Sequence, residues 1–308
     1  MSGIWMQEPF AQRMREVYPE KGQAWLDALP EVLKELEERW RIRLEPPFAD
    51  LSYHYVAPAT TADGQPVVLK LGVPNPQLRS EADTLRLADG RGYVRLMESD
   101  EAIGALLLEQ VLPGVPLTTI EDDDEATRIA AGVMRKIWQP APDSHSFGGV
   151  GEWAKGTERL RHEFDGRTGL FDRTLVEEVE ALFADLLPSM EEQVVLHGDL
   201  HHANILSAER EPWLAIDPKG IVGEAAYEVG QLLRNPFPLI LDWPDPQATF
   251  RRRIEILADE LGLDRRRMRD WAIAFGLVNA WDIYDDHGPS QWLFSWLQLI
   301  KEQSEVRF

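Results

Sequence analysis

The alternation of apolar and polar residues divides the chain into a helical start, a strand-rich segment and a mainly helical remainder. Over residues 4–46, apolar side chains recur every three or four positions, as on an amphipathic helix, and Pro30 predicts the start of a second helix there. From Pro47 the pattern changes to short apolar runs between turn residues, which indicates strands. The helical period returns over residues 117–194 and from Asp242 onward.

The strand-rich segment contains four predicted strands and one predicted helix. The strands are expected at residues 53–57, 67–71, 93–97 and 105–108. The turn sequence at residues 62–65 favours a hairpin between the first two strands. The helix is expected to begin with Asn75 as its N-cap and Pro76 as its first residue, and to run to Asp89.

The length of 308 residues is sufficient for two lobes, each with its own core. Pro113-Gly114 marks a chain turn after the last of these strands. We predict an N-terminal lobe over residues 1–110, with a helical extension (1–46) and a nucleotide-binding sheet (47–110), and a C-terminal lobe over 111–308. A nucleotide base between two lobes would be held by backbone groups, so the carbonyl of Glu109 and the N–H of Val111 are the predicted adenine contacts.

Lys70 is an unusual residue within an apolar predicted strand. A lone buried ammonium group is costly, so Lys70 requires an anionic partner. Glu81 lies three residues after Leu78 and four before Leu85, on the apolar face of the predicted helix. The two side chains suggest a pair in which Lys70 contacts nucleotide phosphates and Glu81 orients it. The alternative is that Lys70 extends to solvent and Glu81 lies at the edge of the apolar face.

The sequence from Val194 to Leu206 contains the pattern H-x-D-x-x-x-x-N, with His197, Asp199 and Asn204 between two apolar runs. Phosphoryl transfer requires a carboxylate beside the attacking hydroxyl and oxygen ligands for Mg²⁺. This pattern supplies both, with Asp199 as the base and Asn204 as a metal ligand.

A second apolar run, Trp213–Ile216, ends in Asp217, and a polar connection of hairpin length at residues 208–212 precedes it. Antiparallel pairing of the two runs would bring Asn204 and Asp217 together, which predicts a second carboxylate ligand for the metal. An alternative is a metal site made by histidines and Asp199, which leaves Asn204 and Asp217 unexplained. Its ligands would be His197, His201, His202 and Asp199.

The net charge of −21 argues against a nucleic-acid partner and is compatible with a cationic small substrate. It is equally compatible with acidic residues that serve solubility alone. Asp282 and Asp285 share one face of a predicted helix, where they form either a seat for a cation or a solvated acidic cluster. The basic runs 251–253 and 265–267 are expected to be solvated, and residues 122–124 to form an exposed first helical turn.

Several classes of protein and site are excluded by the composition. The chain has no cysteine, so it has no disulfide, thiolate nucleophile or cysteine-metal site. No stretch reaches the 18 or more apolar residues of a membrane span. No export signal is visible, which leads us to expect a cytoplasmic protein without a membrane partner.

In chain order, a strand lysine, a helix glutamate, a Pro-Gly turn, H-x-D-x-x-x-x-N and a strand aspartate resemble the protein-kinase-like fold. The sequence 197–206, HGDLHHANIL, is similar to that of the aminoglycoside phosphotransferase family, and it resembles the streptomycin 6-kinase and hydroxyurea phosphotransferase branch more closely. The resemblance covers roughly residues 47–240. It is carried by Ala62-Asp63-Gly64, Val68-Leu69-Lys70, Leu106–Glu109, Trp213–Gly220 and Leu232–Pro236.

The resemblance implies an α+β, bilobal fold, with a small N-lobe containing an antiparallel sheet and a larger, mainly helical C-lobe. It implies ATP-dependent phosphorylation of an alcohol on a small molecule, such as an aminoglycoside like streptomycin. By similarity, Asp199 is the base and Asn204 and Asp217 bind Mg²⁺. Lys70 would contact phosphates, and Glu228 would brace the catalytic loop.

The chain departs from the kinase pattern in two places. The expected phosphate-covering loop, within residues 50–54, has no glycine, so its backbone cannot approach phosphate as a glycine-rich loop does. Asp217-Pro218-Lys219 replaces Asp-Phe-Gly. Two other functions remain open: a metabolic kinase acting on an amino alcohol or sugar, and a nucleotide-binding regulatory pseudokinase. The sequence also leaves the oligomeric state open.

Overall fold

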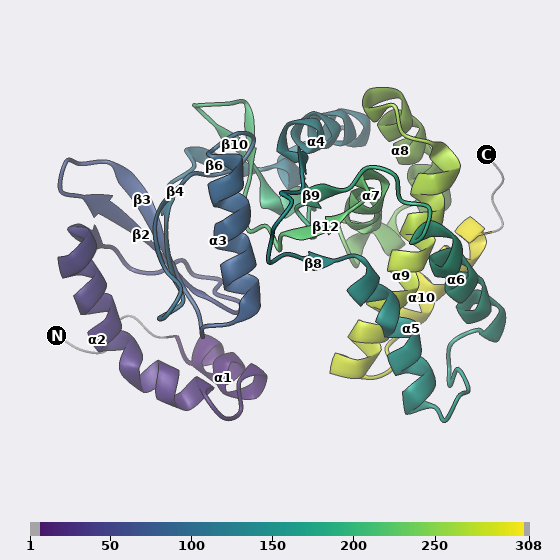
Figure 1. Cartoon of the computed structure of the whole chain (residues 1–308), viewed down its shortest axis with the longest axis horizontal. Coiled ribbons are helices and arrows are strands. Elements are labelled where there is room, and N and C mark those ends of the chain that lie inside the picture. The colour runs from purple at the N-terminus through teal and green to yellow at the C-terminus, as the bar shows by residue number, and fades with distance from the viewer. Residues whose placement is uncertain (1–6, 305–308) are drawn as a thin grey trace. The chain divides into compact units, whose positions relative to one another are not determined.

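The computed structural model describes residues 7–304, which form two compact units (Figure 1). The first unit ends at Gly114 and the second begins at Val115, so the division lies within strand β6 (Pro113–Pro116). Within the described range, no helix combines the length and the apolar character that crossing a membrane requires.

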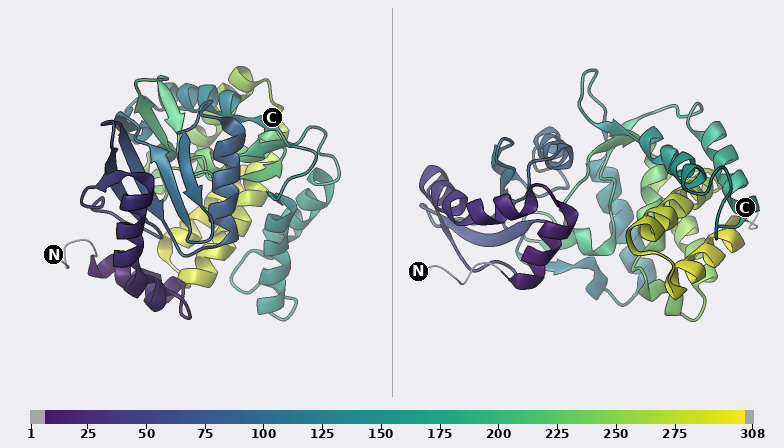
Figure 2. Two further views of the ribbon diagram at one scale, coloured as in Figure 1. Left: turned by 60° about the vertical axis from the view of Figure 1, so that its left-hand side comes forward. Right: turned by 90° about the horizontal axis from the view of Figure 1, so that it is seen from below.

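The first unit is built around a five-stranded antiparallel sheet in the order β1-β2-β3-β5-β4. Its strands are β1 (Ile42–Leu44), β2 (Tyr55–Thr61), β3 (Pro66–Leu71), β4 (Leu96–Asp100) and β5 (Ala105–Glu109). Its helices are α1 (Glu8–Val17), α2 (Gly22–Trp40) and α3 (Pro76–Ala88). Figures 1 and 2 show α2 and α3 on opposite faces of the sheet.

The two faces of β3 meet different helices because neighbouring strand residues point to opposite sides. Leu69 and Leu71 belong to the core that α1 and α2 form with the sheet. Lys70 lies between them in sequence and faces α3, which carries Glu81. The period of the strand therefore explains how a lysine is accommodated in a run of buried apolar residues.

Three predictions of elements in this unit were wrong. Helix α2 continues through Pro30, whose exposed ring lies on the outer face of the helix; a proline can be accommodated within a helix at the cost of one backbone hydrogen bond. The helical extension ends at Trp40, because Arg41 is left-handed (φ 53°), and β1 follows within the predicted helical stretch. The strand expected at residues 93–97 is β4, which begins at Leu96.

The second unit is mainly helical. Its helices are α4 (Asp123–Ile137), α5 (Gly151–Glu163), α6 (Arg173–Leu186), α7 (Ala225–Arg234), α8 (Pro246–Leu261), α9 (Arg265–His287) and α10 (Gln291–Ser304), with 3-10 turns at Leu117–Thr119, His202–Asn204 and Leu239–Asp242. Five consecutive residues of α9, Trp271–Phe275, are buried, so other elements cover every face of this helix. Helices α5, α6, α7, α8 and α10 pack against it.

Two small sheets in this unit hold the segments around the H-x-D-x-x-x-x-N pattern of residues 197–204. One has the order β11-β10-β6, and the other the order β7-β9-β12-β8. Their strands are β7 (Gln139–Pro140), β8 (Gly148–Gly149), β9 (Val194–Leu196), β10 (Ile205–Ala208), β11 (Trp213–Ala215) and β12 (Ile221–Gly223).

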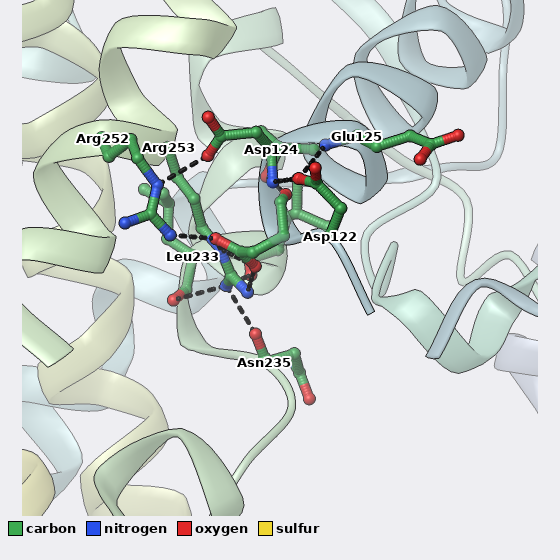
Figure 3. A network of polar contacts seen from close by, with 10 residues as sticks. Asp122, Asp124, Glu125, Leu233, Asn235, Arg252 and Arg253 are labelled. Atoms are coloured by element: carbon green, nitrogen blue, oxygen red, sulfur yellow. Dashed lines mark hydrogen bonds and ion pairs between the residues drawn. The ribbon is translucent and has the colours of Figure 1, made fainter. Parts of the chain in front are cut away.

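The expectation that residues 122–124 and the two arginine runs are solvated was wrong for Asp123, Arg253 and Arg267. Arg253 is fully buried (0% exposed) and donates through Nε to Asp123 Oδ1 at 3.0 Å (Figure 3). Asp122 instead caps α4, accepting hydrogen bonds from the amides of the second and third residues after it. Arg267 pairs with Glu224, the residue before α7. These ion pairs connect α4, α7, α8 and α9.

Candidate active site

The H-x-D-x-x-x-x-N pattern, residues 197–204, forms the loop between the end of β9 and the start of β10. Gly198 adopts a left-handed conformation (φ 79°), and a Cβ at this position would come within 3.2 Å of the Ile221 side chain. Asn204 donates from Nδ2 to the backbone carbonyl of Asp199 at 3.0 Å. This bond fixes the carboxamide, so that its oxygen, the atom that a cation requires, lies on the side away from the Asp199 carbonyl.

The hairpin predicted after the motif is present. Strands β10 and β11 pair antiparallel with Ile205 opposite Ala215, and the Ile216 N–H donates to the Asn204 carbonyl at 3.0 Å. Asp217 therefore follows directly after the residue that is paired with Asn204. Asp217 is exposed and left-handed (φ 58°), a conformation that is costly for a non-glycine residue and is often retained at functional sites.

His197 has a structural part in the loop and is neutral. Its ring is fully buried, with Nε2 2.8 Å from the Ile216 carbonyl, while Nδ1 accepts a hydrogen bond from the Asp199 N–H at 3.2 Å. A ring nitrogen that accepts carries no proton, so Nε2 carries it and donates. Burial lowers the pKa of His197 to about 4, which agrees with this neutral form.

Glu228 of α7 braces the loop, as the resemblance to the family led us to expect. Glu228 is 1% exposed, and its carboxylate accepts hydrogen bonds from the N–H groups of His197 (2.6 Å) and Gly198 (3.0 Å). Burial raises the pKa of Glu228 to about 7, although these two N–H donors act to lower it.

This pKa predicts a pH dependence of stability that Glu228→Gln removes. The unfolded carboxyl group ionises near pH 4.5, whereas the folded one holds its proton up to about pH 7. Because the unfolded chain binds fewer protons in this window, the free energy of unfolding falls as the pH rises, by roughly 3 kcal/mol. Chemical denaturation of the wild type and of Glu228→Gln from pH 4.5 to 8 measures this change in the free energy of unfolding. Parallel curves for the two proteins would contradict it.

The carboxylate of Asp199 has a donor at each oxygen. Gln231 Nε2 donates to Oδ1 at 2.7 Å, and Lys219 Nζ lies 3.2 Å from Oδ2. The Gln231 amide is itself oriented by Arg234, whose Nη2 donates to Gln231 Oε1 at 3.0 Å, while Nη1 donates to Asn279 Oδ1 at 2.7 Å. The Asp199 side chain is therefore held by groups from the β11–β12 loop and from α7.

Gln231 and Lys219 were not predicted from the sequence as residues of the site. Gln231 lies three positions after Glu228, so the helical period places both on one face of α7. That spacing was a usable signal once Glu228 was expected to brace the loop. Lys219 lies two residues after Asp217, but its sequence position alone does not indicate that it faces Asp199.

The predicted pair of Lys70 and Glu81 forms in the first unit. Both residues are 3% exposed, and Lys70 Nζ lies 2.8 Å and 2.7 Å from the two carboxylate oxygens of Glu81. The alternative, in which Lys70 extends to solvent, was wrong. The ammonium group is held in one position by both oxygens of its partner, which suits a fixed phosphate contact.

Glu109 and Val111 lie at the end of the same sheet. Glu109 is the last residue of β5, and both its N–H and its carboxylate Oε2 bond to the backbone of Arg95, at 2.9 Å and 3.1 Å. The following N–H, of Gln110, donates to the Pro66 carbonyl at 3.3 Å. The chain leaves the sheet here, and the adenine contacts of Glu109 and Val111 stay predictions.

Asp282 and Asp285 both lie on α9, as predicted, but in different surroundings. Asp282 Oδ1 accepts a hydrogen bond from Arg159 Nη2 at 2.9 Å, and its side chain is 30% exposed. Asp285 is exposed. A cationic group that binds at Asp282 would therefore compete with Arg159.

The alternative metal site of histidines and Asp199 does not form. Among the side chains that the structure describes, those of residues 7–285 and 288–304, there is no group of three or more histidine and carboxylate side chains that could hold a metal ion. His202 is 5% exposed, and burial lowers its pKa to about 3. The oxygen pair Asn204 and Asp217 is a different kind of ligand set, which suits Mg²⁺ together with substrate phosphates.

Comparison with known proteins identifies the family. A family described as aminoglycoside/hydroxyurea antibiotic resistance kinase matches residues 39–286. The chain belongs to this family. It is 34% identical over 281 residues to a streptomycin 6-kinase of Streptomyces glaucescens, covering 90% of this chain and 91% of the relative. It is also 34% identical over 270 residues to a hydroxyurea phosphotransferase of Kitasatospora aureofaciens, covering 86% and 76%.

A solved structure confirms the fold. It is a thermostable variant of an aminoglycoside phosphotransferase in complex with ADP and hygromycin B. The TM-score is 0.60 at 14% identity, covering 89% of this chain and 99% of that one. The predicted α+β kinase-like fold is therefore correct. Membership of the family makes the chain an enzyme of the phosphotransferase class.

Proposed function

We propose that this phosphotransferase moves the γ-phosphoryl group of ATP to an alcohol group of an aminoglycoside, with streptomycin as the acceptor and Mg²⁺ as the metal. The observation that carries the proposal is the loop in which Glu228 and Gln231 hold Asp199 next to the Asn204–Asp217 hairpin. Family membership and the two relatives with 34% identity support the reaction and the acceptor class.

The residues present fit both proposed cofactors. The Asn204 amide oxygen and the Asp217 carboxylate are hard oxygen ligands of the kind that Mg²⁺ prefers, and the metal when bound supplies charge neutralisation at the phosphates. Lys70, held by both oxygens of Glu81, is suited to contact the phosphates of ATP. The solved relative in complex with ADP supports an adenine nucleotide.

The acceptor is activated by Asp199. Its carboxylate accepts the proton of the acceptor hydroxyl as that oxygen bonds to phosphorus. Asp285 and Asp282 are the proposed contacts for cationic groups of the acceptor, and the net charge of −21 attracts a cation while disfavouring nucleic acid. Since the reaction consumes ATP, we assign it to the cytoplasm.

A panel of acceptors tests the proposal. The purified protein is incubated with ATP and Mg²⁺ and with streptomycin, a second aminoglycoside, hydroxyurea, choline or a hexose. We expect streptomycin to give the fastest ADP release and a product that gains one phosphoryl group by mass spectrometry. ADP release with choline or the hexose alone would instead identify a metabolic kinase. ATP binding without turnover of any acceptor would identify a pseudokinase.

A further inference from the structure

Lys219 is a charged residue at the candidate base to which the function above gives no part. Its Nζ lies 3.2 Å from Asp199 Oδ2, whereas Oδ1 accepts the hydrogen bond from Gln231. The amide of Gln231 is held in place by Arg234. The donor at Oδ1 is an amide that Arg234 holds in place, whereas the donor at Oδ2 is the flexible ammonium group of Lys219, which can move away and leave Oδ2 to take the proton.

The backbone fixes Lys219 at this position. Its N–H donates to the His197 carbonyl at 2.7 Å, and the N–H of Gly220 donates to the same carbonyl at 3.2 Å. Strand β12, which starts at Ile221, pairs antiparallel with β9, so that Ile221 lies opposite Leu196. The loop that carries Asp217 and Lys219 is thus attached directly to the loop that carries Asp199.

The pair of Lys219 and Asp199 is poorly explained as a structural ion pair. The two side chains are 31% and 24% exposed, and pairs that solvent reaches contribute little to stability. By contrast, the ion pair of Lys70 and Glu81 is buried away from solvent, with each side chain 4% exposed. A flexible ammonium group at the proton-accepting oxygen is, however, well placed for chemistry.

We propose that Lys219 is a second catalytic residue of the proposed transfer, whose ammonium group contacts the phosphoryl group as it moves to the acceptor. The acceptor hydroxyl must lie within hydrogen-bond distance of Asp199 Oδ2, and the phosphorus that it attacks is one bond further away. A cation at the same oxygen therefore reaches the phosphoryl oxygens, where it stabilises the transition state. This inference rests on the proposed function.

The step balances without a further reactant. The acceptor oxygen forms the new bond to the γ-phosphorus while the bond from that phosphorus to the bridging oxygen breaks, and ADP leaves with the electron pair. The hydroxyl proton passes to Asp199 Oδ2. Lys219 keeps its protons and moves from the carboxylate to the phosphoryl oxygens, so it acts by charge and not as an acid.

The full-length enzyme with Lys219→Met and Lys219→Arg tests the assignment, with streptomycin or the best acceptor of the panel. We expect Lys219→Met to lower kcat about 10²- to 10³-fold, with KM for ATP and acceptor changed no more than about threefold. The melting temperature should stay at the wild-type value, and Lys219→Arg should recover part of kcat. Lys136→Met is the matched control, because it removes an exposed ammonium group 2.9 Å from Glu211 and should leave kcat unchanged.

Three outcomes would overturn the assignment. One is a Lys219→Met variant with wild-type kcat. Another is a loss of kcat that follows a loss of melting temperature and that Lys219→Arg does not relieve, which is the result of a structural role. In both cases the active wild type leaves the proposed function intact. The third is a wild type without turnover of any acceptor, which removes the proposed function and this inference together.

Discussion

Asp199→Asn is expected to lower kcat by about 10³-fold or more while ADP binding and the melting temperature stay close to wild type. The asparagine side chain has nearly the same size, and its Oδ1 can still accept the hydrogen bond that Gln231 donates to Asp199. What it lacks is an oxygen that takes the proton of the acceptor hydroxyl. Steady-state kinetics and calorimetric titration with ADP measure the two parts of this result.

The matched control is Asp259→Asn. Asp259 makes the same kind of contact, to Arg265 at 3.0 Å, but its side chain is 77% exposed. The same chemical change at this position should leave kcat unaltered. If Asp199→Asn retains turnover within about tenfold of wild type, Asp199 is not the base.

Arg253→Met is expected to lower the free energy of unfolding of the second unit by about 3–5 kcal/mol, because it leaves a buried network without its cation. Besides its bonds to Asp123, Arg253 Nη1 donates to the carbonyls of Leu232 (2.9 Å) and Asn235 (2.6 Å). The substitution would leave these carbonyls without that donor and Asp123 with a weaker partner. Thermal melting and urea denaturation measure the loss.

Arg252→Met is the control, since the neighbouring arginine differs mainly in burial. Arg252 Nη2 lies 2.8 Å from Asp123 Oδ2, and its Nε lies 2.6 Å from Asp124 Oδ1, but the Arg252 side chain is 43% exposed against 0% for Arg253. Solvent and salt screen such a pair, so a loss of about 1 kcal/mol or less is expected. Equal losses for the two variants would show that burial does not decide the effect.

The effect of Arg253 should extend to the active site. The carbonyls of Leu232 and Leu233, which Arg253 binds, belong to the last turn of α7, the helix that also presents Glu228 and Gln231. If α7 is displaced, Glu228 no longer lies where it accepts hydrogen bonds from the N–H groups of the loop, and Gln231 no longer lies where it donates to Asp199. We therefore expect Arg253→Met to lower kcat at temperatures where the protein is still folded.

Local motifs identified much of the site from the sequence. The spacing of His197, Asp199 and Asn204 predicted the loop, because one short segment carries all three residues. The apolar runs that flank it gave the hairpin to Asp217, since strands joined by a short connection pair with each other. The pair of Lys70 and Glu81 could be predicted because a buried ammonium group requires a carboxylate and the helical period placed one on the apolar face.

Contacts between segments that lie far apart in the chain could not be predicted from the sequence. Arg252 and Arg253 are identical as letters, yet one is exposed and the other is buried against Asp123, 130 positions away. The exposed side of α2 at Pro30 likewise depends on which face of the helix meets the sheet. In each case a prediction from local pattern failed because burial is a property of the assembled unit.

The sequence by itself determined the kind of chemistry, the candidate loop for it and the family, since these depend on residue types at fixed short spacings. Only the tertiary structure decided that Gln231 and Lys219 divide the two oxygens of Asp199 between them, and that Arg253 holds α7 from within. The physical reason is that a side chain's partner is set by the packing of elements far apart in the chain, and the period of one element fixes only its own faces.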